Sequence, residues 1–249
     1  MIIFLILLNL PLIGKENYFK KMNSNLFDTW SSLFNHSSFY CLDKNSDLDS
    51  SLEILNSRFT YPEILEAHPN RKKDFLLGRL CASKAFEIHY GTELLSLPMS
   101  ADRSPLWPSE VIGSISHNQF MVGAAVSSCK NLLGLGIDIE VMGRTKLELA
   151  RYIRSKEDIQ AHKIFNERDL LTFIFSAKEA LYKALYPTAK CFFGFETAAI
   201  KEINHLNKTF RIDLISNISK DLGPENRFQF EGRFDILGKN ILSVLEIQN

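Results

Sequence analysis

Two acidic residues stand one residue apart in a short apolar segment. Asp138 and Glu140 lie in LLGLGIDIEV, which has the composition of a β-strand. Side chains alternate along a strand, so both carboxylates point to one face while Ile139 points to the other. Neighbouring carboxylates repel each other unless a cation lies between them, and Mg²⁺ binds oxygen ligands. The spacing therefore suggests a magnesium site, and the alternative is an edge strand with two solvated acids.

A second charged group lies in the segment FSAKEALYKALYP. Glu179 and Lys183 are four residues apart, which places them on one face of a helix, and Lys178 stands beside them. An ordinary Glu-to-Lys helix pair, worth ~0.2 to 0.5 kcal/mol, also explains this spacing. The functional alternative is that Lys183 serves a phosphate as a point charge.

Ser116 and His117 follow a glycine-containing turn in GSISHNQF. Adjacency in sequence does not make a catalytic dyad, because a nucleophile and its base must meet through their side chains. A histidine at the end of a strand commonly makes a routine hydrogen bond. The functional alternative is a contact from His117 to a phosphate oxygen.

Basic residues are frequent between positions 71 and 103. A run of charges before a helix is usually a solvated face, and we expect this for Lys73. Arg79 differs because it lies inside the apolar run FLLGRL, where an unpaired charge would be costly. Arg79 therefore needs a partner or a ligand.

The elements that position these residues follow from hydrophobic periodicity. The residues after Pro69 predict a helix that Gly91 ends, and residues 97–114 predict an irregular loop. Residues 114–128 and 132–141 read as two strands. A second helical pattern runs from Ser155 to Tyr186, where Pro187 is expected to end it. Four strand-like segments follow: FFGFETAAIKEI, TFRIDLI, RFQFEGRFDIL and NILSVLEI.

This order predicts an α+β chain in two similar halves, with a seam near residues 128–133. The 249 residues, 45% of them hydrophobic, are enough to bury a substantial core. Twenty-nine basic and 29 acidic residues cancel, which argues against binding to a nucleic-acid backbone. The four cysteines are scattered without metal-ligand spacing, so we expect reduced thiols and a cytoplasmic protein.

The first 21 residues form an apolar segment that has no basic region before it. It is too short to span a bilayer before Pro11. We therefore expect no stable membrane insertion. The segment reads as a peripheral extension, or as the product of a start codon placed too early, since Met22 opens an ordinary soluble sequence.

Five stretches together resemble the 4'-phosphopantetheinyl transferases of the surfactin and enterobactin type, and most of all the enterobactin synthase component D branch. They are FLLGRLCASKAF, RSPLWPSEVIGSISHNQFMVGAAV, GLGIDIE, FSAKEALYKALYP and FFGFETAAI. They span about half of the chain, from Arg71 to Ile200. The combination of SISH, GIDIE and FSAKEALYKA is highly specific.

The resemblance implies a pseudo-twofold pair of similar α/β subdomains, residues 22–133 and 134–249, with the active site in the cleft between them and a monomeric state. It implies transfer of the phosphopantetheine arm of coenzyme A to a serine of an apo acyl or peptidyl carrier protein, with release of adenosine 3',5'-bisphosphate. Asp138, Glu140 and Glu179 would bind Mg²⁺, and Glu179 and Lys183 would act in catalysis. The residues expected at coenzyme A are Arg71, Lys72, Arg79, Lys84, Arg103, Ser116, His117, Lys178 and Lys183.

One position departs from the family pattern. Close relatives often read GRxCAR, whereas this chain has Ser83 at the last position and Lys84 one place later. One residue corresponds to a rotation of about 100° around a helix. Lys84 is therefore displaced from the phosphate that the arginine would contact.

Two other functions fit the same residues. A magnesium-dependent nucleotide pyrophosphatase would need the same carboxylates but would use water as the nucleophile. An inactive carrier-binding homologue would keep the fold, but its acidic residues would be damaged, and here all three are present. The sequence does not specify the carrier, whether from siderophore, polyketide or fatty-acid assembly.

Overall fold

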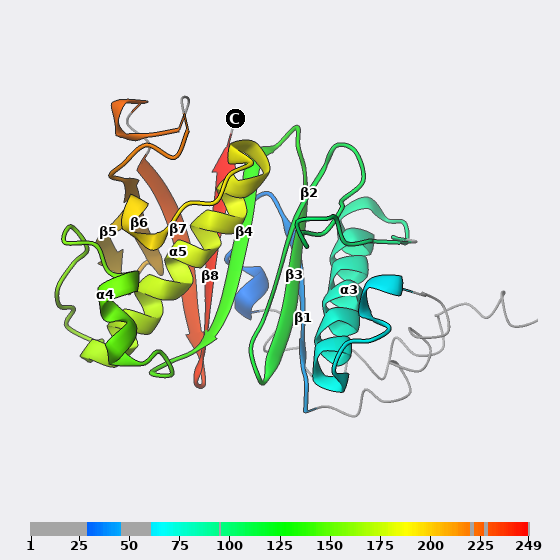
Figure 1. The fold of residues 1–249 in the computed structure, drawn as a ribbon, viewed down its shortest axis with the longest axis horizontal. Coiled ribbons are helices and arrows are strands. Elements are labelled where there is room, and N and C mark those ends of the chain that lie inside the picture. The colour runs from blue at the N-terminus through cyan, green and yellow to red at the C-terminus, as the bar shows by residue number, and fades with distance from the viewer. Residues whose placement is uncertain (1–28, 46–60, 95, 220–221, 227–228, 249) are drawn as a thin grey trace, which may run out of the picture.

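A computed structural model describes residues 29–45, 61–94, 96–219, 222–226 and 229–248, so the apolar segment 1–21 lies outside the described residues. Two antiparallel sheets stand side by side (Figure 1). The smaller sheet has the order β1-β3-β2, with strands Ser38–Asp43, Met121–Ser128 and Val111–His117. The larger has the order β4-β8-β7-β6-β5, with strands Leu132–Val141, Asn240–Gln248, Gln229–Leu237, Thr209–Leu214 and Ala198–Asn204.

Each sheet is covered by one long helix (Figure 1). Helix α3, Pro69–Tyr90, packs on the smaller sheet, and α5, Glu167–Ala189, packs on the larger. A short helix α4, Ala150–Ile153, precedes α5. Single 3-10 turns occupy Pro62–Ile64, Leu147–Leu149, Phe195–Thr197 and Pro224–Asn226. The predicted α+β class is confirmed. No helix in the described ranges is long and apolar enough to cross a membrane.

Helix α3 begins and ends where its sequence predicts. Pro69 occupies the first helical position, where its missing N–H costs nothing. Gly91 adopts the left-handed conformation, with φ 71°, and its amide donates to the carbonyl of Glu87. The first of the two predicted helices is therefore confirmed.

The second helix differs from its prediction at both ends. It begins at Glu167 instead of Ser155, because Asn166 caps it by accepting from the amide of Asp169 at 2.9 Å. It also continues past Pro187 to Ala189, and Lys190 closes it with φ 51°. The expectation that Pro187 ends the helix is wrong. A proline in the last turn removes only one donor, and the helix has just two residues left to form.

The segment 114–128, predicted as one strand, is a hairpin. Strand β2 starts at Val111, inside the predicted loop, and ends at His117, and β3 starts at Met121. The Asn118 side chain makes the turn, because its Oδ1 accepts from the amides of Phe120 at 2.7 Å and Met121 at 2.8 Å. The predicted strands of the C-terminal part correspond to β5, β6, β7 and β8.

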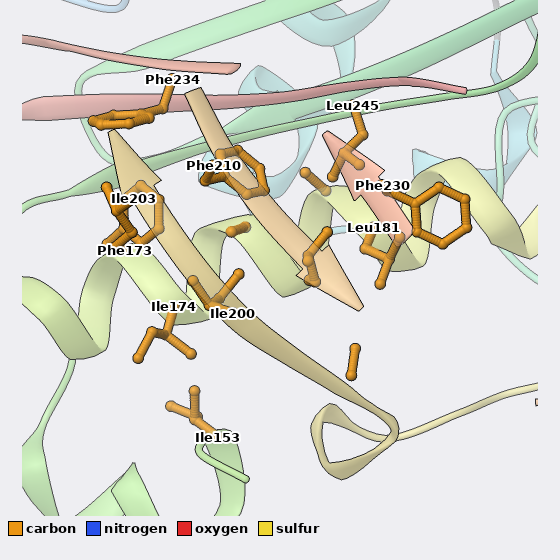
Figure 2. Close-up of a cluster of buried hydrophobic side chains, with 14 of the residues drawn as sticks. Ile153, Phe173, Ile174, Leu181, Ile200, Ile203, Phe210, Phe230, Phe234 and Leu245 are labelled. Carbon is orange, nitrogen blue, oxygen red and sulfur yellow. The ribbon is translucent and has the colours of Figure 1, made fainter. Parts of the chain in front are cut away.

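The main core lies between α5 and the larger sheet. Figure 2 shows Phe173, Ile174 and Leu181 of the helix facing aromatic and branched side chains of the strands. Phe173 meets Phe210 and Phe234 edge to face, with ring centroids 5.5 and 4.9 Å apart. This packing fixes the helix against the sheet.

Two glycines of β4 let α5 approach the strand closely. A Cβ atom added at Gly136 would overlap the carbonyl oxygen of Ala180, and one at Gly134 would overlap that of Ala184. Gly134, Gly136, Asp138 and Glu140 alternate along β4 and therefore share a face. The backbone of α5 consequently lies against the strand that carries both acids.

The opposite face of β4 joins the two sheets. Its Leu135, Ile137 and Ile139 are buried in one cluster with Trp30 and Phe39 of the first part of the chain. Strand β3 ends at Ser128 and β4 begins at Leu132, so the chain leaves the smaller sheet at the predicted seam. The division into two subdomains at residues 133 and 134 stays a prediction.

Candidate active site

Asp138 forms the centre of the polar cluster between β2, β4 and α5. Its buried carboxylate accepts through Oδ1 from Lys183 Nζ at 2.8 Å and from the Ser116 hydroxyl at 3.0 Å. The other oxygen, Oδ2, is buried and has no hydrogen-bond partner among the residues that the structure describes. Such an oxygen is costly unless a ligand satisfies it.

Lys183 is held by three acceptors from neighbouring elements. Besides Asp138, its ammonium donates to the carbonyl of Ile137 at 3.0 Å and to the Ser116 hydroxyl at 3.1 Å. The Ser116 hydroxyl also accepts from the amide of Ile139 at 3.1 Å. The helix pair with Glu179 is therefore not what holds Lys183 in place. The lysine serves as a counter-ion within the cluster.

Ser116 and Ser114 connect the two sheets at this point. The amide of Ile137 donates to the Ser114 hydroxyl at 3.0 Å, two residues before the equivalent bond from Ile139 to Ser116. These hydroxyls satisfy an edge of β4 that no neighbouring strand of its own sheet covers. Ser116 was predicted to bind coenzyme A, and the structure places it as a bridge between Asp138, Lys183 and β4.

The pKa values of Glu140 and Glu179 are both raised, chiefly by burial. Burial, followed by the charge of Asp138, raises the pKa of Glu140 to about 7. Burial also raises the pKa of Glu179, with Lys183 opposing the rise and Asp138 adding to it. The structure thus places Asp138, Glu140, Glu179 and Lys183 close enough for their charges to act on one another.

The described ranges contain no group of three or more His, Cys, Asp or Glu side chains arranged to hold a metal ion. Mg²⁺, however, is commonly bound by only one or two protein carboxylates, with waters and substrate phosphates as its other ligands. The unpartnered oxygen of Asp138 and the raised pKa of Glu140 beside it fit such a partial site. The chemistry of these donors is therefore compatible with the predicted ion.

His117 lies at the end of β2 beside two residues that the sequence did not single out. Its Nδ1 is 3.6 Å from Oδ2 of Asp74, and the other oxygen of Asp74 pairs with Lys44. Burial lowers the pKa of His117. Asp74 raises it, and Lys44, Lys183 and Arg71 lower it further. The ring is still 38% exposed and so can reach a ligand.

The remaining basic candidates take several positions. Arg79 is buried, donates through Nε to the carbonyl of Leu97 at 2.8 Å, and lies 4.1 Å from the centre of the Phe75 ring. Its cost of burial is thus offset by protein groups. Arg71 is exposed and is one of the charges that act on His117.

Three other candidates bond locally. Lys72 donates to the carbonyl of Leu65, and Lys84 pairs with Glu87 at 2.7 Å one turn along α3. Arg103 is exposed in a turn with φ 69°. The structure does not show these three side chains at the Asp138 cluster.

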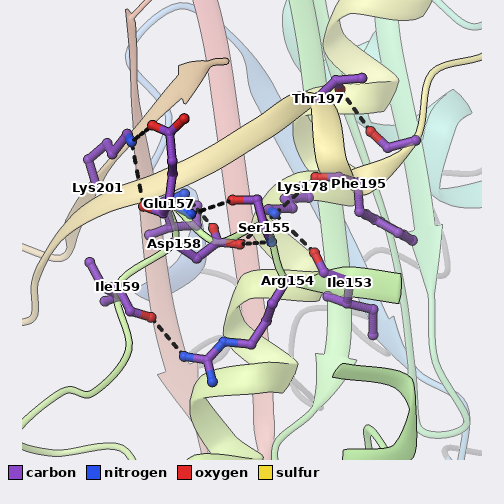
Figure 3. Close-up of polar contacts among 12 residues, drawn as sticks. Ile153, Arg154, Ser155, Glu157, Asp158, Ile159, Lys178, Phe195, Thr197 and Lys201 are labelled. Carbon is purple, nitrogen blue, oxygen red and sulfur yellow. Dashed lines mark hydrogen bonds and ion pairs between the residues drawn. The ribbon is translucent and has the colours of Figure 1, made fainter. Parts of the chain in front are cut away.

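Lys178 points into a different network, which Figure 3 shows. Its buried ammonium donates to Asp158 at 2.7 Å and to the carbonyls of Ile153 and Phe195, each at 2.9 Å. Asp158 also accepts from the amides of Ser155 at 2.6 Å and Ile200 at 2.7 Å. All three donors of Lys178 are therefore used in fixing the segment before α5. Lys183 also has three acceptors, but its side chain is 26% exposed, whereas that of Lys178 is only 2% exposed. The expectation that Lys178 binds coenzyme A therefore does not fit its buried position.

Comparison with known proteins identifies the family of the chain. Residues 61–127 match the family model of the 4'-phosphopantetheinyl transferase N-terminal domain, and residues 134–231 match that of the 4'-phosphopantetheinyl transferase superfamily. The chain is 29% identical to 4'-phosphopantetheinyl transferase Npt of Nocardia iowensis over 210 residues, which cover 74% of this chain and 91% of that protein.

Two further relatives match this chain over a smaller share of their own length. Enterobactin synthase component D of Salmonella typhi is 33% identical over 152 residues, or 58% of this chain and 60% of that protein. 4'-Phosphopantetheinyl transferase PptT of Mycobacterium tuberculosis is 28% identical over 145 residues, or 56% of this chain and 62% of that protein. Together with the acidic cluster on β4 and α5, these matches show that the chain belongs to the 4'-phosphopantetheinyl transferase superfamily.

Proposed function

We propose that this protein transfers the 4'-phosphopantetheine group of coenzyme A to a serine of an apo carrier protein and releases adenosine 3',5'-bisphosphate. The observation that carries the proposal is the meeting of Asp138, Glu140, Glu179 and Lys183 in one cluster. Reaction at a pyrophosphate needs groups of both signs, because charge moves onto the leaving phosphate while a hydroxyl loses its proton.

Asp138 and Glu140 would hold Mg²⁺, with Glu179 as a third carboxylate. When bound, the ion would neutralise charge on the coenzyme A pyrophosphate. The Oδ2 atom of Asp138 supports this role, since none of the described residues donates to it. Binding of a cation would also lower the pKa of Glu140 from its raised value of about 7.

We assign Glu179 as the general base that accepts the proton of the carrier serine. Burial raises its pKa, which makes its carboxylate a better proton acceptor than an ordinary surface carboxylate. The attacking oxygen comes from the carrier serine, so no nucleophile of this chain is needed. Such proton transfer contributes roughly 10²- to 10⁴-fold to the rate.

Lys183 and His117 would serve the phosphates. Lys183 already lies against Asp138 and acts on the pKa of His117, so both belong to one electrostatic environment. The ammonium would stabilise the leaving phosphate and His117 the nucleotide part. The carrier itself is unspecified, but the relatives named enterobactin synthase component D make peptide-assembly carriers the first to test.

The test is mass spectrometry of apo carriers incubated with the protein, coenzyme A and Mg²⁺. We expect the carrier serine to gain the phosphopantetheine mass. Glu179→Gln should abolish transfer while coenzyme A still binds, and Glu167→Gln, at the exposed start of the same helix, is the matched control. Normal transfer by Glu179→Gln would rule out the base.

A carrier-free reaction separates the rival function. Release of adenosine 3',5'-bisphosphate from coenzyme A and Mg²⁺ alone would identify a pyrophosphatase that uses water. Binding of a carrier without modification or hydrolysis would identify an inactive homologue. We also infer that the protein is cytoplasmic and monomeric. Sedimentation of the purified protein would test its oligomeric state.

A further inference from the structure

Asp74 of α3 contacts a lysine and a histidine at the edge of the candidate site. One oxygen pairs with the ammonium of Lys44, which is itself buried, and the other lies 3.6 Å from Nδ1 of His117. Lys44 also donates to the carbonyl of Asn118 at 2.6 Å. A single carboxylate thus connects α3, the residue after β1 and the end of β2.

The backbone that carries His117 is fixed on both sides. The amide of Lys44 donates to the carbonyl of Phe120 at 2.7 Å, on the turn that follows His117. The Asn118 side chain, which closes that turn, donates to Asn240 at the start of β8 at 2.8 Å. The backbone at His117 is therefore anchored by neighbouring elements, and the contact with Asp74 restricts how the histidine ring turns.

The charges that face His117 come from every neighbouring element. Lys44 follows β1, Arg71 and Asp74 lie on α3, and Lys183 lies on α5. Three are cations that disfavour an imidazolium, and Asp74 is the acid that favours it. An anionic ligand placed among the three cations would reinforce Asp74.

We propose that Asp74 is a positioning residue that acts through His117, holding the Nδ1 side of the ring so that the imidazole can serve an anionic group of the substrate. This inference rests on the proposed function only for the identity of that anion. Asp74 does not need to touch the substrate, because one of its oxygens pairs with Lys44 and the other faces His117. Its effect should therefore vanish when His117 is removed.

The first experiment needs no substrate. We would follow the imidazole of His117 by NMR while the pH is changed. Asp74→Asn should move the titration midpoint to lower pH by about 0.5 to 1 pH unit, since the acid that favours the charged ring is gone. Lys44→Met should move it to higher pH. Glu87→Gln, which breaks the Lys84 pair elsewhere on α3, should leave it unchanged.

The second experiment is a double-mutant cycle on the KM for coenzyme A against pH. Asp74→Asn should shift the pH at which KM begins to rise to lower values, with the kcat at low pH retained. In a His117→Asn background the same change should have no further effect on the pH dependence. An equal effect in both backgrounds would overturn the proposal, because Asp74 would then act without His117.

The two experiments separate this inference from the proposed function. If the wild-type protein neither binds coenzyme A nor modifies a carrier, the proposed function fails while the NMR midpoints still decide the Asp74 contact. If transfer occurs but Asp74→Asn does not move the midpoint, this inference fails alone. Where Asp74→Asn does not fold, the tautomer of His117 in the wild-type protein provides the decision by nitrogen NMR, because Lys44→Met also removes a cation that acts on His117 directly. A neutral ring that carries its proton on Nε2 instead of Nδ1 would overturn the contact with Asp74.

Discussion

Lys178 and Lys183 lie five residues apart on α5, yet they belong to different hydrogen-bond networks. Lys183 is partly exposed and pairs with Asp138. Lys178 is buried and pairs with Asp158, and the side chains of this second pair are 2% and 0% exposed, respectively. A rotation of about 100° per residue separates their directions. Their neighbours, rather than the residue type, decide which one can meet a substrate.

We expect Lys178→Met to destabilise the protein strongly. Removing one partner of a buried ion pair leaves the other charge uncompensated, at a cost of about 3 to 5 kcal/mol in the free energy of unfolding. Urea denaturation measures the loss. Lys201→Met is the matched control, because Glu157, its partner, is 55% exposed and such pairs are worth ~0 to 1 kcal/mol. A stable Lys178→Met variant that no longer binds coenzyme A would show instead that Lys178 is a coenzyme A ligand.

Glu140 makes the stability of the metal-free protein depend on pH. Its pKa is raised from 4.5 to about 7, so the folded state binds the proton more tightly than the unfolded state does. Its contribution therefore favours folding at low pH and is lost as the pH rises through about 7. In a chelator, Glu140→Gln should stabilise the protein more at pH 8 than at pH 5, by on the order of 2 kcal/mol. Equal shifts in the unfolding free energy at both pH values would contradict the raised pKa.

At the scale of elements, the close contact of α5 with β4 forms the site. Asp138 can meet a helix residue only because Gly134 and Gly136, on the same face of the strand, leave room for the helix backbone. This contact turns two separate sequence patterns into one cluster.

Gly136→Ala should therefore damage both stability and the site. The added methyl group would overlap the carbonyl oxygen of Ala180, which is backbone and can move only with the whole helix. We expect a loss of about 3 kcal/mol or more in urea denaturation, and weaker binding of coenzyme A. Gly78→Ala is the control, since its methyl would lie 3.1 Å from a side-chain carbon of Ile115 and a helical alanine gains up to about 1 kcal/mol. Similar losses in both variants would argue against the contact.

The sequence predicts the parts of the site that local periodicity controls. Alternation along β4 places Asp138 and Glu140 on one face, and the spacing of Glu179 and Lys183 places both on one face of α5. Periodicity does not show which charges pair across elements. Lys44 lies 30 residues from Asp74, and Lys178 lies 20 residues from Asp158.

The elements that were mispredicted have a similar cause. The β2–β3 turn depends on the Asn118 side chain, and a strand pattern that continues through the turn conceals it. The residues before α5 are held in a loop by hydrogen bonds that the Asp158 carboxylate accepts from the amides of Ser155 and Ile200. These bonds compete with helix formation. A side chain that satisfies backbone groups in a loop can thus override a helical pattern.

At the scale of the molecule, side chains connect the two sheets where no backbone ladder does. Ser114 and Ser116 of β2 accept from amides of β4. At the other end, the carboxylate of Glu246 on β8 accepts from the amides of Asn35 at 2.8 Å and His36 at 3.1 Å. Beneath these bonds, the fully buried Trp30 shares a hydrophobic cluster with residues of β4 and β8. A core shared in this way argues that neither sheet is stable without the other.

We therefore expect the two sheets to unfold in one transition. Both tryptophans, Trp30 and Trp107, precede the seam, so their fluorescence reports on the first part of the chain, whereas far-ultraviolet circular dichroism reports on all of it. In urea the two signals should give the same midpoint. Val244→Ala, a change in β8 that removes a buried contact of the Trp30 cluster, should lower both midpoints together, at a cost of about 2 kcal/mol. A fluorescence transition that precedes the loss of circular dichroism would instead show that the halves are independent domains, because the shared cluster would then contribute too little free energy to couple them.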